Sequence, residues 1–317
     1  MLRAVAVNGN VVLDPGWIYP EVAELRKALA GWSWPDARAV LDRVEPAERT
    51  ELIRIGAERF DLAGFLHGVL AKDPADAAAA AMLGAHFTEV GWRIRTRRPA
   101  QFVSREQFAE FHGWLCKAEQ VLIEAAARHP EDPAVWVCRL PTARGLSLGG
   151  PEARRRYDRL AATDPHHVPG QVQLLQELCP KWTGNWDELH AFAREAMLAA
   201  PPGSHAGSLV AEAHIEHWTD LPEPDDQQYL ADRQAELVEA AQRSIWHADF
   251  RRTIGWVRAA GVFAMAFSLA GDLRSADAAF ALLGNFGSER PWDYLGDPHT
   301  VIPARRAEAR RTVEDAR

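Results

Sequence analysis

The stretch "EAHIEHW" places two histidines, His214 and His217, three residues apart. On a helix this spacing puts both imidazoles on one face, about 60° apart around the helix axis. Zinc motifs present two histidines from one helical turn in a similar way. Glu212 and Glu216 fall roughly opposite His214 on such a helix, so neither carboxylate completes a metal site there. A third ligand would have to come from elsewhere in the chain.

Five other histidines form the pool for that third ligand: His166, His167, His190, His205 and His247. The order and spacing of the stretch also differ from the HExxH zinc motif. Three interpretations therefore stay open: a metal site, a histidine pair that contacts a ligand, and structural histidines. In the structural interpretation, His214 lies between Val210 and Trp218 on a packing stripe and forms a hydrogen bond where two helices meet.

The stretch "GLSLG", residues 145–149, matches the GxSxG pattern in which a strand-to-helix turn exposes a nucleophilic serine. The flanking residues have a helical pattern, and no parallel-sheet pattern surrounds them. We therefore expect Ser147 to lie in a glycine-rich loop between helical units. P-loop, dinucleotide-binding, EF-hand and Cys/His zinc patterns do not occur in the sequence, so we expect no cofactor.

The elements that must position these residues are mostly helices. After Pro20, alanine is abundant and apolar residues recur at intervals of three and four. Ser104 and Gln107 have capping-box spacing at the start of a long helix that stops before Pro130. The N-terminus is the exception, because "LRAVAV" and "VVLD" flank "NGN" and predict a short β-hairpin over residues 1–15.

Three prolines, Pro130, Pro165 and Pro201, each close a helical run, at separations of 35 and 36 residues. A repeat of about 34 residues is typical of arrays built from pairs of antiparallel helices. Between two such helices lies the turn "PKWTGN", where we expect Trp182 and Trp186 to brace the hairpin.

Small residues occupy similar places in two of these units. "TGNWDELHAFAREAMLAAP" has Gly184 in the turn, Ala193 and Ala196 in the second helix, and Pro201 at its end. "AGVFAMAFSLAGDLRSADAAFALLG" has the small residues Ala266, Gly271, Ala276 and Ala279. In this respect residues 74–284 resemble tetratricopeptide-repeat proteins, although most of the consensus Trp, Leu, Gly and Tyr positions are missing. The resemblance implies contact with other proteins.

We therefore predict an all-α fold, a right-handed solenoid of antiparallel helical hairpins of tetratricopeptide-like type, preceded by the short hairpin. Four parts are expected: the β-hairpin at 1–15, a helical region at 16–129, the repeats at 130–290 and a charged C-terminal helix or tail at 291–317.

Composition disfavours several classes of protein. The chain has 317 residues and a formal net charge of −8, whereas nucleic-acid binders usually need a basic surface. No apolar stretch approaches the roughly 20 residues of a membrane helix, so we expect no membrane contact. Three dispersed cysteines without a CxxC pair suit reduced thiols, and we expect a cytoplasmic protein. Both a monomer and a homodimer stay open.

The first helices of hairpin repeats line the concave face of an array, so their polar residues are candidates for recognition. Together with two residues of the turn, the candidates are Arg139, Arg144, Gln171, Gln176, Lys181, Trp182, His214, Glu216 and His217. They suit hydrogen bonds and charge pairs with a peptide. The sequence therefore predicts a non-catalytic module that binds a partner protein or peptide. The alternative is a hydrolase or transferase, metal-assisted or not, with its site around His214 and His217.

Overall fold

The computed structural model describes residues 11–96, 98, 100–222 and 228–315, and all regular structure within them is helical. Two compact units make up the chain. One unit is Pro20–Asn185, and the other joins Met1–Tyr19 to Trp186–Arg317. The sequence predicts boundaries at residues 15, 129 and 290.

The unit Pro20–Asn185 contains nine of the α-helices among the described residues and a short 3-10 turn at Ala100–Phe102. Its helices are α2 (Pro20–Ala30), α3 (Trp34–Leu41), α4 (Pro46–Ala57), α5 (Leu62–Lys72), α6 (Ala77–Arg95), α7 (Arg105–Arg128), α8 (Pro133–Gly145), α9 (Gly150–Ala161) and α10 (Val168–Glu177). The predicted capping box is confirmed at α7, where Ser104 and Gln107 each bond the other's backbone N–H.

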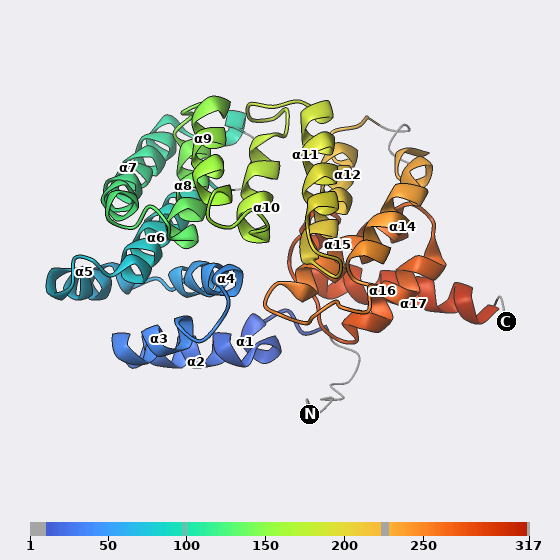
Figure 1. Cartoon of the computed structure of the whole chain (residues 1–317). Coiled ribbons are helices and arrows are strands. Elements are labelled where there is room, and N and C mark those ends of the chain that lie inside the picture. The colour runs from blue at the N-terminus through green and yellow to red at the C-terminus, as the bar shows by residue number, and fades with distance from the viewer. Residues whose placement is uncertain (1–10, 97, 99, 223–227, 316–317) are drawn as a thin grey trace. The chain divides into compact units, whose positions relative to one another are not determined.

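Two helices form the centre of this unit. Residues 78–88 of α6 are all buried, and α8 is buried over most of its length. α6 packs against α4, α5, α7 and α8, and α8 packs in turn against α4, α9 and α10. Figure 1 shows α8, α9 and α10 side by side in green. A Cβ atom on Gly84 would lie 2.4 Å from Cγ of Leu122, so glycine is what lets α6 and α7 approach so closely.

The other unit has the same design with different helices. They are α1 (Pro15–Ile18), α11 (Trp186–Ala199), α12 (Ser208–Trp218), α14 (Gln234–Arg243), α15 (Trp256–Leu269), α16 (Leu273–Leu283) and α17 (Pro298–Asp315), with 3-10 turns at His205–Gly207, Ala231–Arg233 and Trp292–Tyr294.

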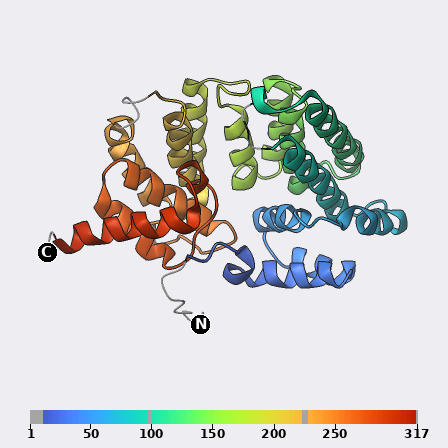
Figure 2. The ribbon, with the colours of Figure 1, turned by 180° about the vertical axis from the view of Figure 1, so that it is seen from behind.

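The central helices of this unit are α12 and α15. Residues 206–216 are all buried, and so is α15 apart from Arg258 and Leu269. α12 packs against α11, α14 and α15, while α16 packs between α15 and α17. Figure 2 shows the long α17 from the side that is hidden in Figure 1. Helix α12, which carries "EAHIEHW", is therefore surrounded by other helices.

The predicted N-terminal β-hairpin is wrong. Residues 1–10, which include the predicted first strand, lie outside the described residues. The residues predicted as the second strand are described, and they do not form a strand. Val12 forms one isolated parallel bridge to Phe286 instead, and Pro15 begins α1 with the Asp14 side chain as its cap. The backbone of this segment forms a hydrogen bond with the chain that follows α16, because the Val12 N–H donates to the Asn285 carbonyl at 2.8 Å.

The structure also does not show one continuous solenoid. In a solenoid each repeat contacts only its neighbours along the chain. Here the Tyr19 hydroxyl accepts the backbone N–H groups of Gly255 and Val257, both at 3.3 Å. In the other unit α4 packs against α8, although three helices separate them in sequence. Such long-range contacts make each unit compact and not linear.

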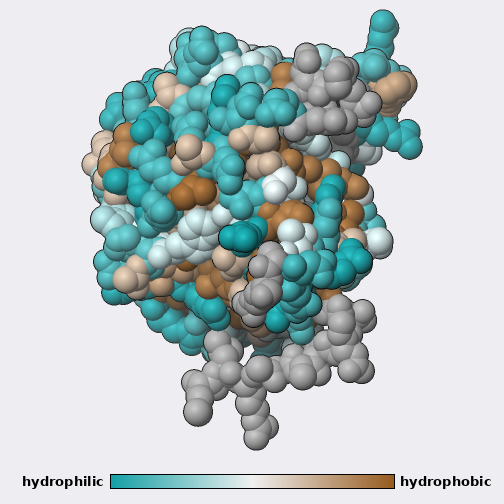
Figure 3. Space-filling model, turned by 90° about the vertical axis from the view of Figure 1, so that its right-hand side faces the viewer, coloured by the Kyte–Doolittle hydropathy of each residue, from teal (hydrophilic) through white to brown (hydrophobic). Residues whose placement is uncertain are grey.

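Within the described residues, no helix combines the length and the apolar character that crossing a membrane would require. On the face that Figure 3 shows, hydrophilic residues predominate, and hydrophobic residues form separate patches among them.

Candidate functional site

Helix α12 brings its two histidines to a group of polar side chains that we call the histidine–tyrosine cluster. His214 and His217 come from α12, His190 from α11, and Tyr229 and Glu236 from the segment that leads into and forms α14. His214 is buried, whereas His190, His217 and Tyr229 are half-buried and reach solvent at one edge. One of the five histidines in the pool, His190, thus joins the pair.

The Tyr229 hydroxyl lies among three imidazole nitrogens. It is 2.9 Å from Nδ1 of His217, 3.0 Å from Nδ1 of His214 and 3.3 Å from Nε2 of His190. Nε2 of His190 and Nδ1 of His217 are themselves 3.0 Å apart. All these distances are within hydrogen-bonding range. Which of these atoms donates and which accepts therefore has to be consistent across the whole cluster.

That arrangement follows from Glu236, whose Oε2 lies 3.0 Å from Nε2 of His214. An ionised carboxylate only accepts, so Nε2 of His214 donates, and in the neutral form of His214 its Nδ1 carries the lone pair. The Tyr229 O–H then donates to Nδ1 of His214. The result is a hydroxyl–imidazole–carboxylate relay, a geometry that acid–base catalysts use.

Burial and mutual proximity keep the other two imidazoles neutral. Burial, followed by the neighbouring His214 and His217, lowers the pKa of His190 to about 3. Burial and His214 likewise lower the pKa of His217. Burial raises the pKa of Tyr229 to about 12, so its hydroxyl keeps its proton at neutral pH. His190, His217 and Tyr229 are therefore uncharged near pH 7.

The open edge of the cluster is aromatic and cationic. The Trp186 ring stacks on His217, with centroids 4.3 Å apart and planes 2° from parallel. The Arg233 guanidinium lies 5.2 Å from the centroid of the Tyr229 ring, within cation–π range. Arg233 is exposed and forms no ion pair with any described residue, whereas Arg194 pairs with Glu239 at 3.1 Å. This edge thus presents a positive charge that has no ion-pair partner in the part of the chain that the structure describes.

Glu212 and Glu216 lie on the side of α12 away from the histidines, as the helical spacing predicted. There they line a small cleft, which we call the carboxylate cleft, with Arg258, Arg290 and Tyr294. Arg258 donates to Glu212, and the Tyr294 hydroxyl donates to Oε1 of Glu216 at 2.6 Å. Glu216, a candidate from the sequence, therefore belongs to a different group of side chains from His214 and His217.

Within the described part of the chain, no three His, Cys, Asp or Glu side chains are arranged to hold a metal ion. In the histidine–tyrosine cluster the central position is taken by the Tyr229 hydroxyl, which serves the three nitrogens as a hydrogen-bonding partner.

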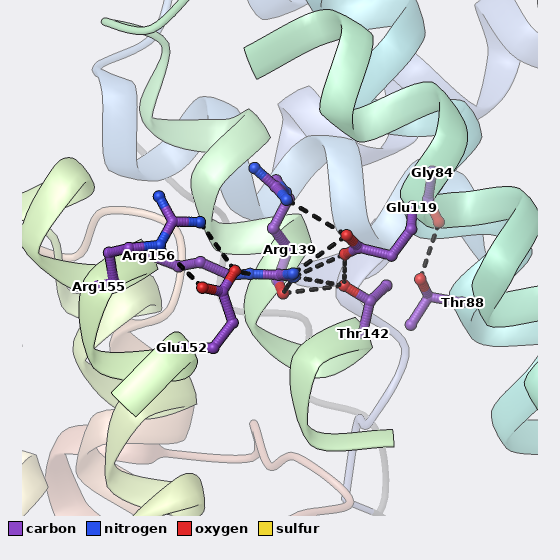
Figure 4. Close-up of polar contacts among 8 residues, drawn as sticks. All are labelled: Gly84, Thr88, Glu119, Arg139, Thr142, Glu152, Arg155 and Arg156. Atoms are coloured by element: carbon purple, nitrogen blue, oxygen red, sulfur yellow. Dashed lines mark hydrogen bonds and ion pairs between the residues drawn. The ribbon is translucent and has the colours of Figure 1, made fainter. Parts of the chain in front are cut away.

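Arg139 lies in a buried ion-pair network of the unit Pro20–Asn185, and not on an open groove. Figure 4 shows the guanidiniums of Arg139 of α8 and Arg156 of α9 both directed toward the carboxylate of Glu119 of α7. The distances to Oε2 of Glu119 are 3.2 Å from Nη2 of Arg139 and 3.0 Å from Nη2 of Arg156. The Thr142 hydroxyl donates to the other oxygen of Glu119. Glu152 also accepts from Nε of Arg156 at 2.7 Å. These contacts join three helices of the core.

The remaining candidates also lie in this unit. Gln171 is buried and donates to the Pro165 carbonyl at 3.2 Å, and Arg144 donates to the Gln173 carbonyl at the same distance. Gln176 is half-buried and Lys181 is exposed. The candidate residues are thus divided between the two units, and most of them serve to connect helices.

The two tryptophans of the turn contact different units. The Trp182 ring packs edge-on against Trp92 of α6 at 6.0 Å, whereas Trp186 stacks on His217. They therefore do not brace a common hairpin, because the boundary between the units falls directly before Trp186. Ser147 lies in an exposed loop between α8 and α9, with no strand before it.

Sequence reasoning missed Tyr229, Glu236 and Arg233. The chain has only 4 tyrosines, and Tyr229 precedes Glu236 by seven residues, two helical turns, so these two could have been paired by periodicity. Nothing in that pattern relates them to α12, however, because the contact depends on how α14 packs.

No protein-family model, no curated protein and no solved structure matches this chain.

Proposed function

We propose that this chain binds an acidic segment of a partner protein at the open edge of the histidine–tyrosine cluster. The observation that carries the proposal is Arg233, an exposed guanidinium that has no ion pair among the described residues and lies beside Tyr229. Arginine and aromatic side chains together are the residues that most often dominate binding energy at protein interfaces. Tyr229 supplies an aromatic ring next to it, and Trp186, stacked on His217, adds a second aromatic ring to the cluster.

The ligand is expected to be anionic for two reasons. Arg233 can accept a carboxylate in two-point contact, the strong form of such a pair. In addition, His190 and His217 are neutral and half-buried, and an anion nearby would favour their protonated forms. Arg139 and Gln171 do not belong to this site, because both are buried in the other unit.

The test is calorimetric titration with two blocked peptides of equal length. One contains aspartate and glutamate, and the other has asparagine and glutamine at the same positions. We expect only the acidic peptide to bind, and Arg233→Ala to weaken binding by about tenfold or more. Arg251→Ala is the matched control, because Arg251 is also an exposed arginine of this unit. Equal binding of both peptides, or equal losses in both variants, would contradict the proposal.

A second candidate function rests on the relay alone. Tyr229, His214 and Glu236 have the hydroxyl–base–orienting-group geometry of hydrolases and transferases, with both distances at 3.0 Å. We would test it with p-nitrophenyl acetate as an acyl donor, with and without added zinc. Hydrolysis that falls in Tyr229→Phe and in His214→Gln, but not in the exposed-residue control His299→Gln, would support catalysis. Equal rates in all four proteins would exclude it for acyl transfer.

A further inference from the structure

A second cleft, which we call the turn cleft, lies where the turn between α15 and α16 meets α14 and α17. Its volume is ≈ 300 Å³. Sites that bind small molecules begin at about this size. Gly271 has a φ of 74°, which lets the chain pass from α15 to α16 within three residues. Apart from its chain neighbours, no atom of the described residues would lie within 4 Å of a Cβ at Gly271, so the turn leaves open space beside it.

The lining of the turn cleft carries one carboxylate, from Asp272, and one guanidinium, from Arg274. Oδ1 of Asp272 accepts the Ser275 backbone N–H at 3.1 Å, and its Oδ2 accepts from Gln234 at 2.8 Å. A carboxylate has about four acceptor positions, so about two of them remain on Asp272. Arg274 is exposed, and none of its N–H groups has an acceptor among the described residues. Within that part of the chain, neither charge forms an ion pair with the other or with a third group.

These two separate charges favour a ligand that carries both signs. A simple anion would match Arg274 and leave Asp272 unmatched beside it, and a simple cation would do the reverse. A zwitterion matches both, because its carboxylate accepts from the guanidinium in two-point contact and its ammonium group donates to the carboxylate. The other lining residues add polar and apolar surface: Gln234, Thr312, Ala270 and Leu273.

We infer that the turn cleft binds a small zwitterion of the free amino-acid class, with its carboxylate on Arg274 and its ammonium group on Asp272. Ala270 and Leu273 give an aliphatic part of the ligand an apolar surface to pack against. The turn cleft shares no residue with the histidine–tyrosine cluster, so the inference does not depend on the proposed function.

L-Valine and 4-aminobutanoate are the probes, because both carry the two charges but hold them at different separations. Binding to the full chain is measured by calorimetric titration. L-Valinamide lacks the carboxylate of L-valine, and 3-methylbutanoate lacks its ammonium group. The amide 4-aminobutanamide and butanoate serve 4-aminobutanoate in the same way. We expect saturable binding of at least one zwitterion, and binding at least about tenfold weaker for its two analogues.

Variants of the two charged residues test the assignment. Arg274→Ala should weaken binding of the zwitterion by about tenfold or more, because it removes the two-point contact. Asp272→Asn should also weaken it, and the start of α16 should stay intact because asparagine caps a helix about as well as aspartate. The unfolding temperature of each variant shows whether it is folded. Arg251→Ala, at an exposed arginine of the same unit, is the matched control and should leave binding unchanged.

No saturable binding of either zwitterion would overturn the inference. A one-charge analogue that binds as tightly as its zwitterion would also overturn it, as would equal affinity in Arg274→Ala and the wild type. None of these results bears on acidic-peptide binding, which the Arg233 variant tests.

Discussion

The ion-pair network around Glu119 and the histidine–tyrosine cluster are both polar groups that join three segments of a helical core. They differ in how their charges are matched. Both oxygens of Glu119 accept from donors, and buried guanidiniums lie beside it. The histidine–tyrosine cluster has neutral imidazoles with facing nitrogens, and its edge reaches solvent. The first arrangement is closed, while the second can still take up a proton or a ligand.

This difference also shows which polar residues of a helical core are useful evidence of function. Arg139 and His214 are both candidates from the sequence, yet Arg139 has its carboxylate partner inside the unit. Arg233 at the edge of the cluster has none among the described residues. An unmatched charge beside adjustable groups is the better indication of a binding site.

The largest effect is expected from Glu119→Gln, which should lower the free energy of unfolding by about 3 kcal/mol or more. The Arg156 side chain is 2% exposed, and the substitution leaves it and Arg139 buried without that counter-charge. Urea denaturation followed by circular dichroism measures the change. Glu124→Gln is a matched control on the same helix, because its pair with Arg128 involves a carboxylate that is 68% exposed. A loss below about 1 kcal/mol for Glu119→Gln would show that the network is not closed as described.

The second effect is a pH dependence that only the histidine–tyrosine cluster should show. Unfolded histidine has a pKa near 6.5, whereas that of His190 is about 3 in the folded chain. The unfolded state therefore takes up a proton as the pH falls below about 6.5, and the folded state does not. The stabilisation is complete above that pH and declines from there to about pH 3.

We expect the folded state to be about 1–2 kcal/mol less stable at about pH 5 than at about pH 7 because of His190, after allowance for its partial exposure. Urea denaturation of the wild type and of His190→Gln at both pH values isolates this contribution. The Glu119 network should contribute little in this range, because its contacts with Arg156 and Thr142 outweigh burial and lower the pKa of Glu119. An identical pH dependence in the two proteins would show that His190 already titrates normally.

The smallest effects are expected from the outer arginines of the two regions. Arg194, beside the histidine–tyrosine cluster, is 44% exposed, and Arg155, beside the ion-pair network, is 52% exposed. Replacing either one with alanine should change the free energy of unfolding by less than about 0.5–1 kcal/mol, because solvent screens exposed pairs. Thermal denaturation of both variants provides the measurement. A clearly larger loss of stability in either variant would mean that the exposed arginine contributes to its region as the buried residues do.

Local patterns allowed much of the helical architecture to be predicted. The capping box at Ser104 and Gln107 depends on residues three apart, and it is present. The hairpin prediction failed although "NGN" is a strong local signal, because Val12 pairs with Phe286, more than 270 residues away. The solenoid prediction failed for a similar reason. Regular proline spacing describes how helices end, and it does not determine which helices pack together.

For the candidate site, the sequence by itself determined that His214 and His217 share one face of a helix and that Glu212 and Glu216 lie on another. This follows from the helical repeat, which fixes angles between residues of one segment. Only the tertiary structure decided that His190, Tyr229 and Glu236 complete the first face, while Arg258 and Tyr294 complete the second. These partner residues come from other segments of the chain. The packing of α11, α14 and α15 around α12 brings them to it. That packing is decided by the burial of the apolar faces of the helices.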